Sequence, residues 1–303
     1  RVNGDFLLTG SSNVLDHKES KDTLAGRLCE LRLHPLSSKE KNDKPNENII
    51  EKLLARDFRL TKKDYSDEVC KHILDGGYPE ILELSGLPKD LWFTSYIATY
   101  IERDARDLAD IRNIDSFIKF VNILATRSGT LLNKSSLSND IGIKDITTEN
   151  YLSIISRIYQ VTLLKPYFIN IGKQFVKSPK VFFNDTGVLC SLLKINSKEQ
   201  LLSSTYIFCE LQKHLSYLQK SASMFHYRTN DKKEIDFIIE VDNELLAIEV
   251  KQSSSVKKDD FKHIIDLQNR YDEKRCLGVV FYNGDMVVEF SDDLVAIPFG
   301  MFL

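Results

Sequence analysis

The chain has 303 residues, of which 42% are hydrophobic and 28% charged, values ordinary for a globular protein with a large core. A formal net charge of −3 excludes a uniformly basic surface, so any nucleic-acid binding must come from a local patch. The five cysteines are scattered, which predicts reduced thiols in a cytoplasmic protein. No apolar run approaches the roughly 18 residues of a transmembrane helix, so we expect no membrane partner and no signal peptide.

The first 48 residues predict short elements separated by polar loops. Residues 5–13, DFLLTGSSN, are typical of a buried strand that runs into a loop. Residues 18–28 predict a short helix, residues 31–36 a second strand, and the lysine-rich residues 37–48 a loop. The chain begins at Arg1 without a methionine, so we expect it to be part of a longer protein.

Three segments resemble the last part of an AAA-type ATPase core in their sequence and order: LLTGSSN, LAGRL and LHPLSSKE. The resemblance implies that Ser11 and Ser12 lie near the terminal phosphate of ATP and that Arg27 reaches a phosphate. A strand-end turn and a surface arginine are the simpler alternatives. The sequence contains no G-x-x-x-x-G-K-[ST] loop. We therefore expect ATP as a cofactor of the full-length protein only, with the missing ATPase segment upstream of residues 1–40.

Residues 41–112 predict a helical lid on that core. Apolar residues at helical spacing indicate helices over 49–60, 65–74 and 92–103. The second helix ends at Gly76-Gly77, residues suited to a helix C-terminus. The segment GGYPE that starts there resembles the GGFPE of the same ATPases.

Residues 113–195 predict a winged-helix domain. Helices over 116–128 and 131–143, with a glycine turn at Gly142 and a third helix opened by Thr147, give the helix-turn-helix pattern. The strand-like segments VTLLKPYFI and PKVFFND would supply the wing. The candidate DNA contacts are basic residues near the third helix and the wing, namely Lys144, Arg157, Lys173 and Lys177, with Lys165 and Lys180 as further wing lysines. A protein-packing module is the alternative.

Residues 234–251 predict a β-hairpin of two strands, EIDFIIEV and ELLAIEVK, joined at Asp242-Asn243. Glu249 and Lys251 are two residues apart and share a face of their strand, and Asp236 on the adjacent strand can lie beside them. Two carboxylates on one patch repel each other unless a cation lies between them. A divalent cation could occupy this site, although a half-exposed strand often carries Glu and Lys on its solvated face.

The spacing of Asp236, Glu249 and Lys251 resembles the PD-(D/E)XK signature of restriction-endonuclease-like folds. The resemblance implies a Mg²⁺ ion that activates water against a phosphodiester, with these residues as catalytic. In the preceding helix, predicted over 206–219, Glu210 matches the second acidic position of the family and would be a third metal ligand. The first acidic position falls at Ser204, a departure that leaves cleavage open. A helix over 257–271 and strands over 277–282 and 294–297 complete a nuclease-like domain over 196–303.

The sequence thus predicts an α/β multidomain protein with a remnant of an AAA-type core, a helical lid, a winged helix and a restriction-endonuclease-like domain. The resemblance implies that the chain is part of an ATP-binding protein that acts on DNA. The full-length protein would have ATPase activity, and the chain would carry a metal-dependent nuclease-like domain. The alternative is an inactive nuclease-like fold that serves as a DNA- or protein-binding module of an ATPase switch. DNA and a second copy of the chain are the implied partners. No Ser-His-Asp arrangement, dinucleotide fingerprint or zinc spacing supports another enzyme chemistry.

Overall fold

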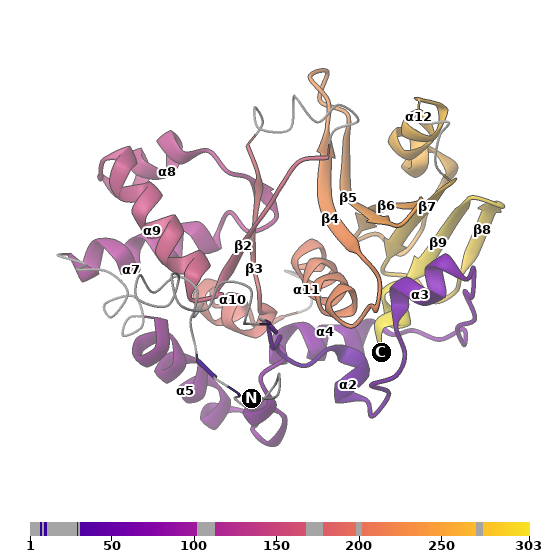
Figure 1. Cartoon of the computed structure of the whole chain (residues 1–303). Helices are drawn as coiled ribbons and strands as arrows, with labels where there is room; N and C mark the ends of the chain where they lie inside the picture. Colours follow the sequence, from indigo (N-terminus) through magenta and orange to yellow (C-terminus); the bar gives the residue numbers. More distant parts are fainter. Residues whose placement is uncertain are drawn as a thin grey trace, which may run out of the picture.

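The computed structural model describes residues 31–101, 113–167, 178–197, 202–270 and 275–303, together with positions 7, 9, 10 and 29. Within these residues the protein is a mixed α/β structure with a three-stranded and a six-stranded sheet. Figure 1 shows the small sheet and the helices of residues 114–157 on the left and the large sheet on the right. The predicted α/β class is confirmed at this level.

Short helices precede the first sheet. They are α2 (Ser38–Lys41), α3 (Ile49–Leu54), α4 (Ser66–Asp75), the 3₁₀ helix η2 (Pro79–Glu83), α5 (Leu87–Tyr96) and the π-helical turn η3 (Ile97–Ile101). The predicted loop over 37–48 is wrong at α2. There Ser37 and Glu40 form a reciprocal capping box, and this local bonding favours a helical turn despite the polar composition.

The middle part of the chain alternates helices with the strands of the small sheet. Its elements are α7 (Ile114–Ala125), β1 (Thr130–Leu131), α8 (Lys134–Ile141), α9 (Asp145–Arg157), β2 (Val161–Leu164), β3 (Lys180–Phe183) and α10 (Thr186–Leu193). The strands pair antiparallel in the order β1-β3-β2.

A glycine turn separates α8 from α9, as the sequence predicts. Gly142 has φ 82° and ψ 36°, the left-handed conformation that glycine adopts at little cost. The predicted start of α9 at Thr147 is wrong, because α9 begins at Asp145 after the N-cap Lys144. The amide of Thr147 already donates to the Lys144 carbonyl within the first turn.

The C-terminal part carries the large sheet. Its elements are α11 (Ser203–Ser216), β4 (Ala222–Arg228), β5 (Glu234–Val241), β6 (Glu244–Lys251), η6 (Lys258–Phe261), α12 (Lys262–Arg270), β7 (Arg275–Tyr282), β8 (Val288–Ser291), β9 (Leu294–Pro298) and η7 (Phe299–Phe302). The strand order is β4-β5-β6-β7-β9-β8, and β6, β7 and β9 are mutually parallel. The predicted hairpin over 234–251 is confirmed residue for residue.

The two faces of the large sheet pack against different helices. Phe237, Ile239 and Ile248 contribute to a core shared with α11, α3 and α4. Ile238 and Ala247, on the opposite face by strand alternation, pack in a second core with α12. Figure 1 shows α11 and α12 on opposite sides of the strands.

A short backbone connection joins the two sheets. Tyr167 N donates to the carbonyl of His226 at 2.6 Å, and His226 N donates to the carbonyl of Lys165 at 3.0 Å. Pro166 therefore forms a parallel bridge to β4. This connection brings the start of β3, in the small sheet, against β5 in the large one.

No helix in the described part of the chain has the length and apolar character needed to cross a bilayer.

Candidate functional site

The two carboxylates predicted from the hairpin lie on neighbouring strands. β5 and β6 pair antiparallel up to Phe237 opposite Ile248, and Asp236 and Glu249 come directly beyond this last pair. Alternation from Ala247 places Glu249 on the face covered further along by α12, and its carboxyl interacts there with Asp236. The two-residue turn between β5 and β6 fixes this register, because loop length sets the register of a hairpin.

Both oxygens of the Asp236 carboxylate have partners. Oδ2 accepts a hydrogen bond from the backbone N–H of Val250 at 3.0 Å, and Oδ1 accepts one from Lys180 Nζ at 3.1 Å. The side chain is only 20% exposed. Asp236 is therefore held in one orientation by the neighbouring strand and by a lysine from the small sheet.

Glu249 has a strongly shifted protonation equilibrium. Burial, followed by the charge of Asp236 and a hydrogen bond to it, raises the pKa of the Glu249 carboxyl to about 9. Lys251 and Lys180 oppose this shift without cancelling it. At neutral pH the Glu249 carboxyl is therefore protonated.

Lys180 belongs to the same cluster, although it is 56 residues away from Asp236 in the sequence. Its Nζ lies 2.7 Å from Glu234 Oε1 and 3.1 Å from Asp236 Oδ1, and its side chain is 3% exposed. Burial alone would lower the pKa of Lys180, but Asp236 and Glu234 outweigh it and raise the pKa. The prediction of Lys180 as a solvent-facing wing residue is wrong.

The sequence carried one signal for this role of Lys180. The residue stands directly before Val-Phe-Phe in a strand that is buried along its length. A lysine in such a strand needs a carboxylate partner, because lysine is almost never fully buried unpaired. Which carboxylate it reaches depends on how the two sheets pack.

Lys251 lies on the same face of β6 as Glu249, as the two-residue spacing predicts. Its side chain is 39% exposed, and its ammonium lies 3.8 Å from Asp260 Oδ1, in the helical segment that leads into α12. Solvent screens a pair at this separation and exposure, so the interaction constrains Lys251 only weakly.

The carboxylate pair fits a divalent cation in part. Two adjacent carboxylates are donors that Mg²⁺ accepts once Glu249 has released its proton and waters or phosphate oxygens complete the shell. Over the residues that the structure describes, no group of three or more His, Cys, Asp or Glu side chains is arranged to hold a metal ion. A cation here would depend on Asp236 and Glu249 alone for its carboxylate ligands.

The structure does not bring Glu210 to this pair. The Glu210 carboxylate is buried on α11, where Oε1 accepts from Lys213 Nζ at 3.0 Å and Oε2 from the backbone N–H of Ser38 at 2.9 Å. Lys213 also donates to the carbonyl of Leu36 at 2.9 Å. The prediction of Glu210 as a third metal ligand is therefore wrong. Its carboxylate instead binds the segment around α2 to α11.

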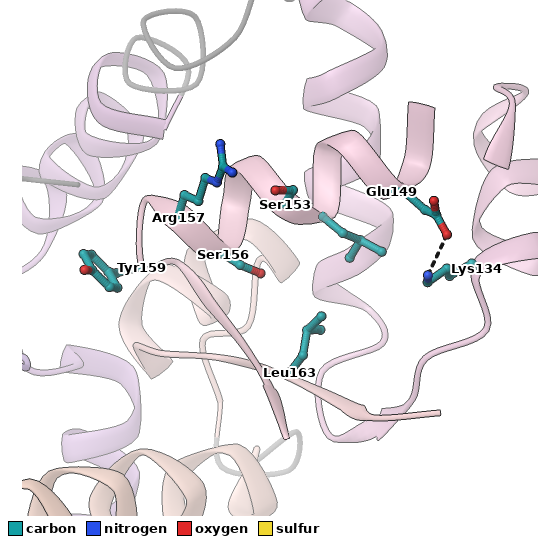
Figure 2. A pocket seen from close by; sticks show the side chains of 8 residues that line it. Lys134, Glu149, Ser153, Ser156, Arg157, Tyr159 and Leu163 are labelled. Carbon is teal, nitrogen blue, oxygen red and sulfur yellow. Dashed lines mark hydrogen bonds and ion pairs between the residues drawn. The ribbon is translucent and has the colours of Figure 1, made fainter. Parts of the chain in front are cut away.

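The outer face of α9 forms a second surface of interest (Figure 2). A pocket of about 510 Å³ lies between α9 and β2; its lining includes Arg157, Tyr159, Ser153 and Leu163. At its other end Lys134 pairs with Glu149 at 2.7 Å. The predicted DNA contacts Arg157 and Lys144 are both exposed, at opposite ends of α9. The surface around the helix is therefore mixed in charge.

Five predicted site residues lie outside the described residues. They are Ser11, Ser12 and Arg27 of the expected nucleotide site and Lys173 and Lys177 of the expected wing. Their predicted roles stay predictions.

Two protein-family models match the chain, each over less than half of it. Residues 66–199 match a domain of unknown function, DUF8612, and residues 202–302 match another, DUF4143. The two matched regions meet between α10 and α11, so the second contains the whole carboxylate cluster except Lys180, which lies in the first.

Curated relatives of the chain include uncharacterized proteins from bacteria and an archaeon. One from Mycobacterium tuberculosis is 27% identical over 247 residues, covering 79% of this chain and 55% of the relative. One from Haemophilus influenzae is 26% identical over 305 residues, covering 95% and 72%, and one from Methanocaldococcus jannaschii is 24% identical over 268 residues, covering 85% and 58%. The chain spans about half the length of the mycobacterial relative. No solved structure matches the chain.

Proposed function

We propose that this chain is part of an AAA-type ATP-binding protein that acts on DNA, with a nuclease-like domain that uses a divalent cation. The observation that carries the proposal is the placement of Asp236 and Glu249 directly beyond the last pair of the β5–β6 ladder, where a cation would relieve the repulsion between two carboxylates. The order of the sequence motifs supports the ATPase part of the proposal, with Ser11, Ser12 and Arg27 near the nucleotide.

The chemistry at the pair follows from the side chains present. When bound, Mg²⁺ would polarise a phosphodiester and lower the pKa of an attacking water. Asp236 and Glu249 would supply carboxylate oxygens, and Glu249 would release its proton as the cation binds. Lys251, with a side chain that is 39% exposed, would stabilise charge that develops on the phosphate from the same face as Glu249.

The helix-turn-helix of α8 and α9 supports DNA as the partner. α9 is preceded by the exposed Lys144 and ends in the exposed Arg157, which suits contacts to phosphates at two points of a duplex backbone. Glu149 and Asp145 on the same helix limit the net attraction, and the phosphate contacts of Lys144 and Arg157 would weaken as the salt concentration rises.

A nuclease assay tests the cleavage part of the proposal. Supercoiled plasmid and linear duplex are incubated with the chain in Mg²⁺ or Mn²⁺, beside Asp236→Asn, Glu249→Gln and the control Glu244→Gln. Glu244 lies on β6 five residues before Glu249, so the control removes a carboxylate from the opposite face. We expect cleavage by the wild type and Glu244→Gln only. Equal inertness of all four proteins would refute cleavage.

A second candidate function is a binding or assembly module without nuclease activity. It is favoured by Lys180, which already neutralises Asp236, and by Glu210, which bonds to Lys213 and Ser38 instead of completing a metal site. Under this alternative, the four proteins shift a labelled duplex equally in a gel and none cleaves it.

A further inference from the structure

The ammonium of Lys180 lies at the carboxylate pair. Lys180 Nζ is 3.1 Å from Asp236 Oδ1 and 2.7 Å from Glu234 Oε1, and Glu234 Oε2 in turn accepts from Arg228 at 2.8 Å. The positive side chains Lys180 and Arg228 thus balance the carboxylates Glu234 and Asp236. This part of the site is neutral without any added ion.

A cation that binds Asp236 would meet the charge of Lys180. Oδ1 is bonded to Nζ and Oδ2 to the Val250 amide, so an ion that takes an Asp236 oxygen would share it with one of these donors. Metal–carboxylate bonds are about 2–2.6 Å long, which would leave the ion close to the ammonium. Because Lys180 is 3% exposed, little solvent is present to screen this repulsion.

We propose that Lys180 is an internal counter-ion that weakens the binding of divalent cations at the carboxylate site in this conformation of the chain. This inference rests on the proposed function, because it takes Asp236 and Glu249 as the cation ligands. Lys180 comes from the small sheet, and the ligands come from the large sheet. The metal affinity of the large-sheet site would therefore depend on where the small sheet holds Lys180.

The attachment of Lys180 determines what must move for the site to open. Lys180, the first residue of β3, comes two positions after Ser178. The carbonyl of Ser178 lies 3.3 Å from His226 Nε2. His226 is buried on β4 and bonds through its backbone to Lys165 and Tyr167. Withdrawal of the ammonium therefore requires the start of β3 to shift relative to β4 and β5, or the lysine side chain to leave its two carboxylates.

Calorimetric titration of Mn²⁺ into the full chain tests the inference without an activity readout. The proteins are the wild type, Lys180→Gln, Lys180→Gln with Asp236→Asn, and the control Lys220→Gln, which removes an exposed lysine in the loop before β4. We expect Lys180→Gln to bind Mn²⁺ at least about tenfold more tightly than the wild type, a difference of about 1.4 kcal/mol. The control should bind Mn²⁺ as tightly as the wild type. The double variant, which lacks the Asp236 carboxylate, should not show the tenfold gain in affinity.

Each other result has a definite meaning. Equal or weaker Mn²⁺ binding by Lys180→Gln, with measurable binding by the wild type, overturns the counter-ion role and leaves the proposed metal site standing. Absence of binding in all four proteins overturns both. If Lys180→Gln does not fold, as a circular-dichroism melt would show, the double variant Lys180→Met with Glu234→Gln takes its place. It removes one positive and one negative charge together, and the same tenfold gain is expected of it.

Discussion

At the scale of single residues, buried charges in this protein are stabilised by specific partners on other segments. Glu210 and Lys213 lie one turn apart on α11, and their side chains are 2% and 6% exposed. Burial would raise the pKa of Glu210, but Lys213 and the other positive groups outweigh it and lower the pKa. The pair is ionised because each member also bonds to the segment around α2, through Ser38 and Leu36.

Removal of one member of this pair should be strongly destabilising. We expect Glu210→Leu to lower the free energy of unfolding by about 3–5 kcal/mol, because it leaves the Lys213 ammonium buried without a counter-charge. Urea unfolding at neutral pH measures the change. The double variant Glu210→Leu with Lys213→Met should lose less than the single variant, since no unpaired charge remains. A double variant as unstable as the single one would contradict this account.

The burial of His214 should make the stability of the folded chain sensitive to acid. It is fully buried on α11, and neither ring nitrogen has a hydrogen-bond partner within the described part of the chain. Burial, reinforced by Lys213 and Lys39, lowers the pKa of His214 to about 4. The unfolded chain therefore binds a proton below about pH 6.5 that the folded chain does not, and stability falls as the pH drops from 6.5 toward 4.

The variant His214→Leu should remove this contribution. Between pH 7 and pH 5 we expect the wild type to lose about 1–2 kcal/mol more stability than the variant, from about 1.4 kcal/mol per pH unit below 6.5. Urea unfolding at the two pH values gives the comparison. Equal losses in the two proteins would mean that His214 takes up its proton in the folded state.

At the scale of elements, the crossover β6-α12-β7 positions the face of the sheet that carries the carboxylates. β6 and β7 are parallel over eight paired residues, and α12 packs on them through Ile264 and Leu267. The close approach of α12 to β7 requires a glycine on β7. A Cβ at Gly278 would lie 2.6 Å from Ile264 Cγ2 and 2.7 Å from Leu294 Cδ2.

The variant Gly278→Ala should therefore displace α12 from the sheet. We expect it to lower the free energy of unfolding by about 1–3 kcal/mol, the usual cost of overpacking a core. Adding Ile264→Ala makes room for the new methyl group, so the double variant should lose less than the sum of the two single variants. Strictly additive losses, measured by urea unfolding, would show that the two positions are not in contact.

At the scale of the whole molecule, one core joins segments from both ends of the described chain. Ile49 and Ile73 of the N-terminal helices pack in the same cluster as Phe281 and Phe302. Lys39 of α2 donates to the carbonyl of Leu303 at 2.7 Å, which adds a polar tie between the same regions. The N-terminal helices and the large sheet are thus parts of one folding unit.

Truncation of Phe302 should destabilise this whole unit. The ring is fully buried and lies against Phe281, Tyr206 and His214. We expect Phe302→Ala to cost about 3–5 kcal/mol of unfolding free energy. The control Leu82→Ala, at a side chain that is 50% exposed, should cost less than about 0.5 kcal/mol. Similar melting temperatures for the two variants would contradict a shared core.

The sequence alone predicted the hairpin of β5 and β6, the nearness of Asp236 to Glu249, and the glycine turn between α8 and α9. These features follow from strand alternation, turn residues and helical spacing, which act over a few neighbouring residues. Only the tertiary structure decided that Glu210 bonds to Ser38 and that Lys180 reaches Asp236, contacts between residues 172 and 56 positions apart. Local patterns do not encode such contacts, because a buried charge finds its partner through the packing of whole sheets and helices.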